Sequence, residues 1–166
     1  MKNLTKVALV VCALTLNSFA ADDTTDFHIG ASSAEVLGQS FTEYNIGYGV
    51  DFYTQKNIYI GLSFDFAYGN VDLENSKKSA DVYSSIADLK LGYALFDNTL
   101  AIYGLGSGAL QSIDSLNGAG FGYGAGVDYK INKSFAINVE YKTYDMTSDG
   151  ADYTYEKINS NIKYTF

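Results

Sequence analysis

Residues 58–69 read IYIGLSFDFAYG, and apolar side chains stand at every second position. The apolar class of this stretch comprises Ile58, Ile60, Leu62, Phe64, Phe66 and Tyr68. Smaller or polar residues such as Gly61, Ser63 and Asp65 lie between them. A two-residue period puts successive side chains on opposite faces of a β-strand, whereas an amphipathic helix repeats every three to four residues. The stretch therefore predicts a strand with two chemically different faces.

The same alternation recurs along the rest of the chain. We expect eight strands, at residues 26–36, 42–54, 57–69, 81–96, 99–111, 119–131, 134–145 and 153–166. The connections at 54–57, 97–99 and 131–134 are short and contain Asn, which is typical of tight turns. The connections near 37–41, 70–80, 112–118 and 146–152 are mostly longer and polar. This pattern predicts an all-β fold, an eight-stranded antiparallel up-and-down transmembrane β-barrel.

Three features favour an apolar outer face over a soluble lipocalin-like barrel or a water-soluble sandwich. The interior of an eight-stranded barrel is narrow, and the non-apolar class is mostly small. Tyrosines gather near strand ends, as in interfacial girdles, at Tyr44, Tyr53, Tyr68, Tyr129, Tyr141 and Tyr153. The non-apolar class also carries both signs of charge, at Asp51, Asp65, Asp88, Asp128 and Glu140 and at Lys90, Lys130, Lys142, Lys157 and Lys163. Since enclosed charges need partners, these ten residues predict a compensated interior network.

The first twenty residues have the organisation of a secretory signal peptide. Lys2 and Lys6 precede an almost wholly apolar run at 7–16, and Ser18-Phe19-Ala20 supplies small residues before a cut between Ala20 and Ala21. The run is about half of the roughly 20 residues that a membrane-spanning helix needs. A lipoprotein signal at Cys12 is an alternative, disfavoured by Val11 before it. We expect a signal peptide at 1–20 and a barrel domain at 21–166.

Composition excludes several classes of function. All 11 basic residues are Lys, and 19 acids give the 166-residue chain a net charge of −8. Removing Lys2 and Lys6 with the signal peptide leaves nine Lys against 19 acids, a net charge of −10. An acidic chain without Arg is poorly suited to nucleic acid, and a mature chain without Cys suits an oxidising compartment. With no Cys and one His in that part, we expect no metal site of the Cys/His type and no cofactor.

Glycine-alternating strands such as 118–129, the segment Glu140-Tyr141-Lys142 and the ending at 162–166 carry a family resemblance. The chain resembles the small eight-stranded outer-membrane barrels of Gram-negative bacteria, the OmpA-like and OmpX-like barrels. The resemblance implies an integral outer-membrane location, contact with lipid and lipopolysaccharide, and a monomer. It also implies that Ile162, Tyr164 and Phe166 form the assembly signal read by the barrel-insertion machinery. The family includes adhesins, structural anchors and lipid-modifying enzymes.

Chemical motifs in the mature chain are few. The pattern Gly104-Leu-Gly106-Ser-Gly-Ala109 matches a dinucleotide fingerprint but lacks the following helix, so these glycines are expected to relieve crowding inside the barrel or let a strand bend. His28 is the only His, and its place near the first strand's start predicts an interfacial residue rather than a catalytic base. Acids assigned to the loops and adjoining strand ends are Glu35, Glu43, Asp72, Glu74, Asp81, Asp114, Asp145, Asp149 and Asp152.

These observations predict a non-enzymatic outer-membrane barrel with a structural or surface-interaction, adhesin-like role. The acids of the loops suggest weak association with lipopolysaccharide through divalent cations, and a host or cell-surface ligand. A lipid A-modifying enzyme and a narrow porin-like channel are the alternatives. The channel is disfavoured because side chains fill the lumen of an eight-stranded barrel.

Overall fold

The computed structural model describes residues 22–72, 79–114, 116–148 and 151–166. The expected signal peptide, its cleavage pair Ala20–Ala21, and the acids Glu74 and Asp149 lie outside these ranges. Within the described ranges, no helix has both the length and the apolar character needed to span a membrane.

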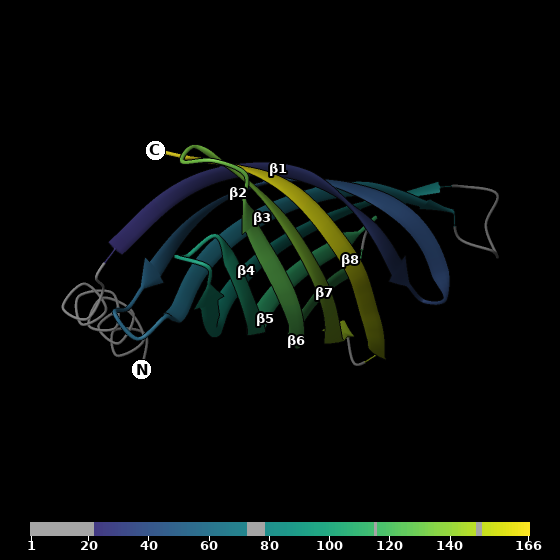
Figure 1. Ribbon diagram of the computed structural model, residues 1–166. Helices are drawn as coiled ribbons and strands as arrows, with labels where there is room; N and C mark the ends of the chain where they lie inside the picture. The colour runs from purple at the N-terminus through teal and green to yellow at the C-terminus, as the bar shows by residue number, and fades with distance from the viewer. Residues whose placement is uncertain (1–21, 73–78, 115, 149–150) are drawn as a thin grey trace, which may run out of the picture.

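Eight antiparallel strands close into one barrel, as the sequence predicts (Figure 1). The strands are β1 (Asp22–Val36), β2 (Gln39–Tyr53), β3 (Ile58–Asp72), β4 (Ser79–Leu95), β5 (Leu100–Ile113), β6 (Leu116–Lys130), β7 (Phe135–Ser148) and β8 (Ala151–Thr165). Each strand pairs with its neighbour in the chain, and β8 closes the sheet against β1, with Asp26 opposite Thr165. No free sheet edge therefore runs the length of the molecule.

The two ends of the barrel differ in their connections. The turn end holds the connections at 54–57, 96–99 and 131–134, together with the start of β1 and the end of β8 (Figure 1). The loop end holds those at 37–38, 73–78, 114–115 and 149–150. At the turn end, Asn57 and the run Phe96, Asp97 and Asn98 adopt positive φ angles between 53° and 62°. Asn and Asp accept this left-handed conformation more readily than most residues, so the Asn-rich sequence suits the turns.

The predicted long loops are mostly wrong. Leu37 and Gly38 alone join β1 to β2, with φ angles of 52° and 77° as in a two-residue hairpin turn. The expected loops at 112–118 and 146–152 likewise shrink to connections at 114–115 and 149–150, and only 73–78 is longer. The strands run further than expected. Their two-residue alternation continues towards the loop end, but the residues there no longer have apolar side chains outside, as a strand in lipid does.

Around the middle of the barrel, the apolar class points outward and the polar class inward. Phe64, Leu89 and Ile137 are exposed on the outer surface, whereas Asp65, Asp88 and Asn138 on the same strands are buried. This arrangement rules out the lipocalin-like alternative with an apolar lumen. Of the expected girdle tyrosines, Tyr44, Tyr68, Tyr129 and Tyr141 are exposed; Tyr53 is instead buried in the barrel and Tyr153 half-buried.

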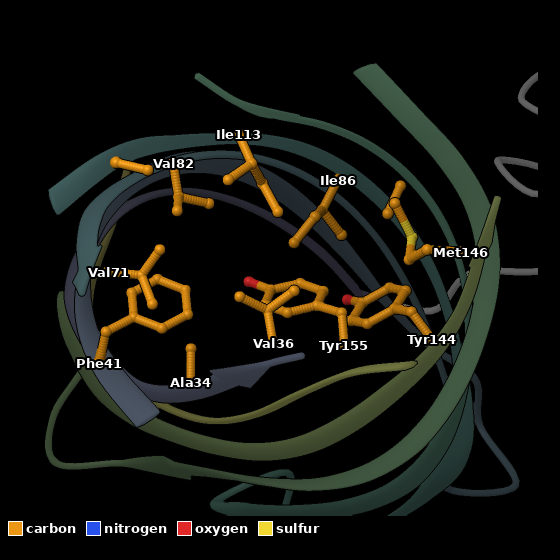
Figure 2. Packing of buried hydrophobic residues seen from close by; sticks show 12 residues of the cluster. Ala34, Val36, Phe41, Val71, Val82, Ile86, Ile113, Tyr144, Met146 and Tyr155 are labelled. Atoms are coloured by element: carbon orange, nitrogen blue, oxygen red, sulfur yellow. The ribbon is translucent and has the colours of Figure 1, made fainter. Parts of the chain in front are cut away.

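Near the loop end, the polarity of the two faces is exchanged. Buried apolar side chains fill the interior there (Figure 2): Ala34, Val36, Phe41, Val71, Ala80, Val82, Ile86, Ala109, Ile113, Tyr144, Met146 and Tyr155. Their outward neighbours, such as Asn70, Asp72 and Asp81, are exposed and polar. We call this part of the barrel the collar: strands that pass beyond the apolar outer band, with an apolar core inside and a polar surface outside. The collar is not among the features predicted from the sequence.

The other end of the lumen has its own apolar layer. Tyr53, Tyr59, Ala94, Ala101, Tyr103 and Leu105 form a second buried cluster there. The Tyr59 ring lies between those of Tyr53 and Tyr103, with centroids 5.5 Å and 5.1 Å away. The lumen is therefore layered, with apolar side chains towards both ends and a polar network between them.

The glycines of β5 are not where the sequence analysis expected them. Gly104 and Gly106 lie on the exposed outer face, and a Cβ atom added at Gly106 would meet no atom within 4 Å. Relief of crowding inside the barrel is thus the wrong explanation for these residues. It does apply to inward positions such as Gly47, where a Cβ atom would lie 2.3 Å from His28 Nε2.

Candidate functional site

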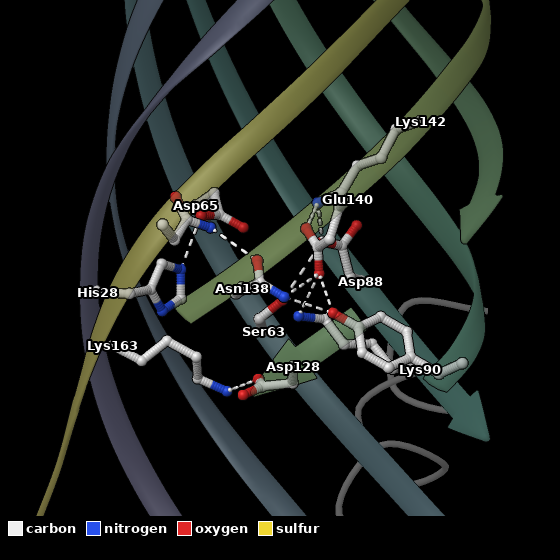
Figure 3. A network of polar contacts seen from close by, with 12 residues as sticks. His28, Ser63, Asp65, Asp88, Lys90, Asp128, Asn138, Glu140, Lys142 and Lys163 are labelled. Carbon is white, nitrogen blue, oxygen red and sulfur yellow. Dashed lines mark hydrogen bonds and ion pairs between the residues drawn. The ribbon is translucent and has the colours of Figure 1, made fainter. Parts of the chain in front are cut away.

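The middle of the lumen holds a network of buried charged side chains contributed by all eight strands except β5 (Figure 3). Among the described residues, the buried acids are Asp26, Glu43, Asp51, Asp65, Asp88, Asp128 and Glu140, and the buried bases are His28, Lys90, Lys142, Lys157 and Lys163. Nine of the ten residues expected in the interior are in this set. The tenth, Lys130, is half-buried, with its Nζ 4.1 Å from the centroid of the Tyr53 ring.

Lys163 on β8 joins three carboxylates near the turn-end side of the network. Its Nζ lies 2.7 Å from both Asp51 Oδ2 and Asp128 Oδ2, and 3.0 Å from Asp26 Oδ2. Tyr59 donates a hydrogen bond of 2.7 Å to Asp51 Oδ1. One lysine thereby ties together β1, β2, β6 and β8, which include the two strands that close the barrel.

Glu140 on β7 is the centre of a second group. Its two carboxylate oxygens lie 2.6 Å from Lys90 Nζ and 2.8 Å from Lys142 Nζ. Lys142 also lies 2.5 Å from Asp88 Oδ2, and Tyr103 donates to Glu140 at 2.8 Å. The described contacts give Lys142 two carboxylates, but pair Lys90 with Glu140 alone.

Glu43 on β2 forms a third group nearer the collar. Lys157 Nζ lies 3.2 Å from Glu43 Oε2, and the Tyr155 hydroxyl donates to the same oxygen at 2.5 Å. The assignment of Glu43 to the solvated acids was wrong, because the residue belongs to the inward class of β2 with Asn45 and Asp51. That shared parity is a signal that the sequence analysis could have used.

His28 and Asp26 were also missed as interior residues. Phe27 and Ile29 point outward, so the alternating positions Asp26 and His28 point inward, and the side chains of Asp26 and His28 are buried. His28 Nδ1 lies 2.8 Å from Asp26 Oδ1, and its Nε2 lies 2.8 Å from Asp65 Oδ1. The expectation of an interfacial His28 was therefore wrong. Both ring nitrogens are engaged by carboxylates, which leaves neither of them free to act as a catalytic base.

The network fills the lumen rather than lining a channel. The space bounded by Asp26, His28, Asp65, Lys90 and Lys163 has no volume that a water molecule could occupy. Ser63, the hydroxyl-bearing residue beside it, donates to Asp88 at 3.3 Å rather than to His28. A nucleophile needs a base within hydrogen-bond reach, so this arrangement does not assemble a hydrolytic site.

The remaining predicted residues lie on the outer surface. The acids Glu35, Asp72, Asp81, Asp114, Asp145 and Asp152 are exposed at the loop end. Across the described part of the chain, no three His, Cys, Asp or Glu side chains are placed to share a metal ion. Ile162, Tyr164 and Phe166 share the outward face of the chain's end, where the Phe166 N–H donates to the Thr25 carbonyl at 3.1 Å.

Several solved structures share this fold at low sequence identity. Neisserial surface protein A matches with a TM-score of 0.59 and 11% identity, over 89% of this chain and 99% of that protein. Ail, the attachment invasion locus protein of Yersinia pestis, was crystallised with the heparin analogue sucrose octasulfate. It matches with a TM-score of 0.58 and 14% identity, over 87% of this chain and 97% of Ail. At these identities, the likeness shows the fold alone.

Sequence comparison gives the family directly. No curated protein sequence matches the chain. The family model described as "Outer membrane protein beta-barrel domain" matches residues 7–166, which is nearly the whole chain. The chain belongs to the outer membrane protein beta-barrel domain family and is an outer-membrane β-barrel of eight strands.

Proposed function

We propose that this barrel has a structural and surface-interaction, adhesin-like role, and that it is neither a pore nor an enzyme. The filled lumen carries the proposal: an ion-pair network without room for water lies between two apolar layers. Ions have no water-filled path through such an interior, and the described part of the lumen offers a lipid substrate no space to enter. The part of the molecule left for interaction is its outer surface.

We place the collar outside the cell. Barrels of this kind keep short turns on the periplasmic side and their larger connections outside, and 73–78 is the longest connection here. The collar then stands above the lipid, where its exposed acids face lipopolysaccharide phosphates or another cell surface. Like charges repel, so contact with lipopolysaccharide needs bridging divalent cations.

Export and assembly complete the proposal. The leader at 1–20 is cleaved between Ala20 and Ala21, and the outward row Ile162, Tyr164 and Phe166 is read by the barrel-insertion machinery. The mature protein then works as a monomer without a cofactor. The rival lipid A-modifying activity would need a base and a nucleophile at the outer leaflet, and the lone His28 is buried between Asp26 and Asp65.

Epitope tags on intact cells test the orientation on which the proposal depends. A tag inserted near Ser76, in the 73–78 connection, should bind antibody without permeabilisation. A tag near Asn98, in the β4–β5 turn, should bind only after the outer membrane is opened. The reverse result would place the collar in the periplasm and remove the basis for a surface role.

A further inference from the structure

The hydrogen-bonded ladder of the barrel has a gap in the collar between β1 and β8. The β1–β8 pairing ends where Val36 lies opposite Tyr155, whereas β7–β8 pairing continues to Ser148 opposite Ala151. The chain leaves β1 at Leu37 and Gly38 and returns as β2, and in Figure 1 the β1–β2 and β7–β8 hairpins diverge at the loop end. In the described chain, no main-chain hydrogen bond joins residues 152–154 to this turn. Residues 152–154 thus form a short free strand edge.

A hollow of about 530 Å³ lies beside this edge. Its walls come from both hairpins: Glu35, Leu37 and Gly38 on one side, and residues 152–154 with Glu156 on the other. We call this hollow the β1–β8 notch. Leu37 is 54% exposed at its rim. Tyr153 fixes the free edge to the interior, because its hydroxyl donates to Gln111 Oε1 at 3.1 Å and its side chain packs against the collar core.

The notch carries negative charge without a described cation beside it. Glu35 and Glu156 lie directly opposite each other across the β1–β8 pair, an unfavourable arrangement for two like charges. Glu156 accepts a hydrogen bond from the Tyr141 hydroxyl at 3.2 Å, and Asp152 accepts one from Thr147 at 2.8 Å. These donors are neutral, and no described ion pair involves either acid or Glu35. A positively charged partner would relieve the repulsion.

We propose that the β1–β8 notch binds an extended polypeptide segment containing Lys or Arg, which adds as a strand to the free edge of β8. Main-chain hydrogen bonds to residues 152–154 supply affinity, and basic side chains over Glu35, Asp152 and Glu156 supply selectivity. The free edge selects an extended peptide over a bare cation, and the charge excludes an acidic segment. The inference deepens the proposed surface-interaction role and rests on it for its biological setting.

Binding to the purified barrel in detergent micelles tests the notch without reference to its orientation in the cell. The probe is a fluorescent peptide of alternating lysine and threonine, titrated at low salt. The double variant Glu35→Gln/Glu156→Gln should weaken binding by about tenfold or more. The matched control, Asp72→Asn/Asp114→Asn, removes the same charge elsewhere on the collar and should weaken binding less than about twofold. Bound peptide should also slow amide hydrogen exchange at residues 152–154.

A second probe separates strand addition from adsorption by charge. The same peptide with N-methyl groups on all its backbone amides keeps its lysines but cannot donate main-chain hydrogen bonds, so it should bind much more weakly. The proposal that the notch binds a basic peptide would be refuted by any of three results: equal affinity of the two peptides, equal loss of affinity in both double variants, or no binding of the first peptide. Such a failure would leave the surface location untouched, because the epitope tags test that separately.

Discussion

At the scale of single residues, the buried lysines of the lumen differ in how many carboxylates they contact. Lys163 has three carboxylates within 3.0 Å, Lys142 has two, and Lys90 has Glu140 alone among the described ion pairs. Removing one partner from a buried pair leaves an uncompensated charge, which costs more than the pair contributes. Lys90 is therefore the lysine that is most sensitive to its partner.

Glu140→Ala should lower stability by about 3–5 kcal/mol, less where water reaches the freed lysines. The loss follows because Lys90 then has no carboxylate, whereas Lys142 keeps Asp88. Urea unfolding in detergent measures the change, with Asp72→Ala on the exposed collar as a control of near-neutral effect. A second change, Lys90→Met, should restore part of the stability and Lys142→Met should not. Equal rescue by both would contradict this division of roles.

Two glycines differ in what surrounds them. Gly47→Ala should destabilise the barrel by about 1–3 kcal/mol, because its Cβ atom would lie 2.3 Å from His28 Nε2 and 2.8 Å from the Phe64 carbonyl oxygen. Gly106→Ala faces open space on the outer surface and should be neutral or slightly stabilising. The comparison is made by urea midpoints in the same detergent. A destabilised Gly106→Ala variant would show that backbone freedom, rather than space, decides at these positions.

At the scale of the strand, the sequence predicts the two-residue repeat better than it predicts which face carries the apolar side chains. The alternation of apolar and polar residues predicts all eight strands, and the turns that contain Asn predict the three connections at the turn end of the barrel. The loop end fails because Asn70-Val71-Asp72 keeps the two-residue period while its apolar residue turns inward. Where apolar side chains are expected on the outer face, such a segment resembles a loop. Pairings such as Lys163 with Asp51, 112 positions apart, additionally depend on the register across the closure, which no local pattern encodes.

The collar core should behave as a water-soluble core does. Ile86→Ala removes a fully buried side chain from the collar cluster and should cost about 2–5 kcal/mol. Leu89→Ala, three residues along β4, removes an exposed side chain on the apolar outer face and should cost much less in detergent. Urea unfolding gives the totals, and amide exchange should speed up first in the collar for Ile86→Ala. Equal effects of both variants would argue against a separate core there.

At the scale of the whole molecule, the barrel combines two solvent regimes on one set of strands. The band around its middle is apolar outside and charged inside, and the collar is polar outside and apolar inside. Each arrangement suits its own surroundings, because lipid accepts apolar surface and water accepts polar surface. The change of polarity along the strands that form the collar core suits a boundary between lipid and water, and the proposed surface role depends on the collar lying on the water side of it.

The layered lumen predicts that the folded protein does not conduct ions. A conducting pore needs continuous water, and here the apolar layer around Tyr59 and Tyr103, the ion-pair network and the collar core stand in series. Planar-bilayer recording of the refolded protein in symmetric salt should therefore show no steady unitary steps. Faster migration of the unboiled than of the boiled protein on a gel would confirm that the sample is folded. Because the three layers act in series, Ile113→Ala, which loosens the collar core alone, should still not conduct. Reproducible steps from the folded wild-type protein would refute the filled lumen and favour the narrow channel.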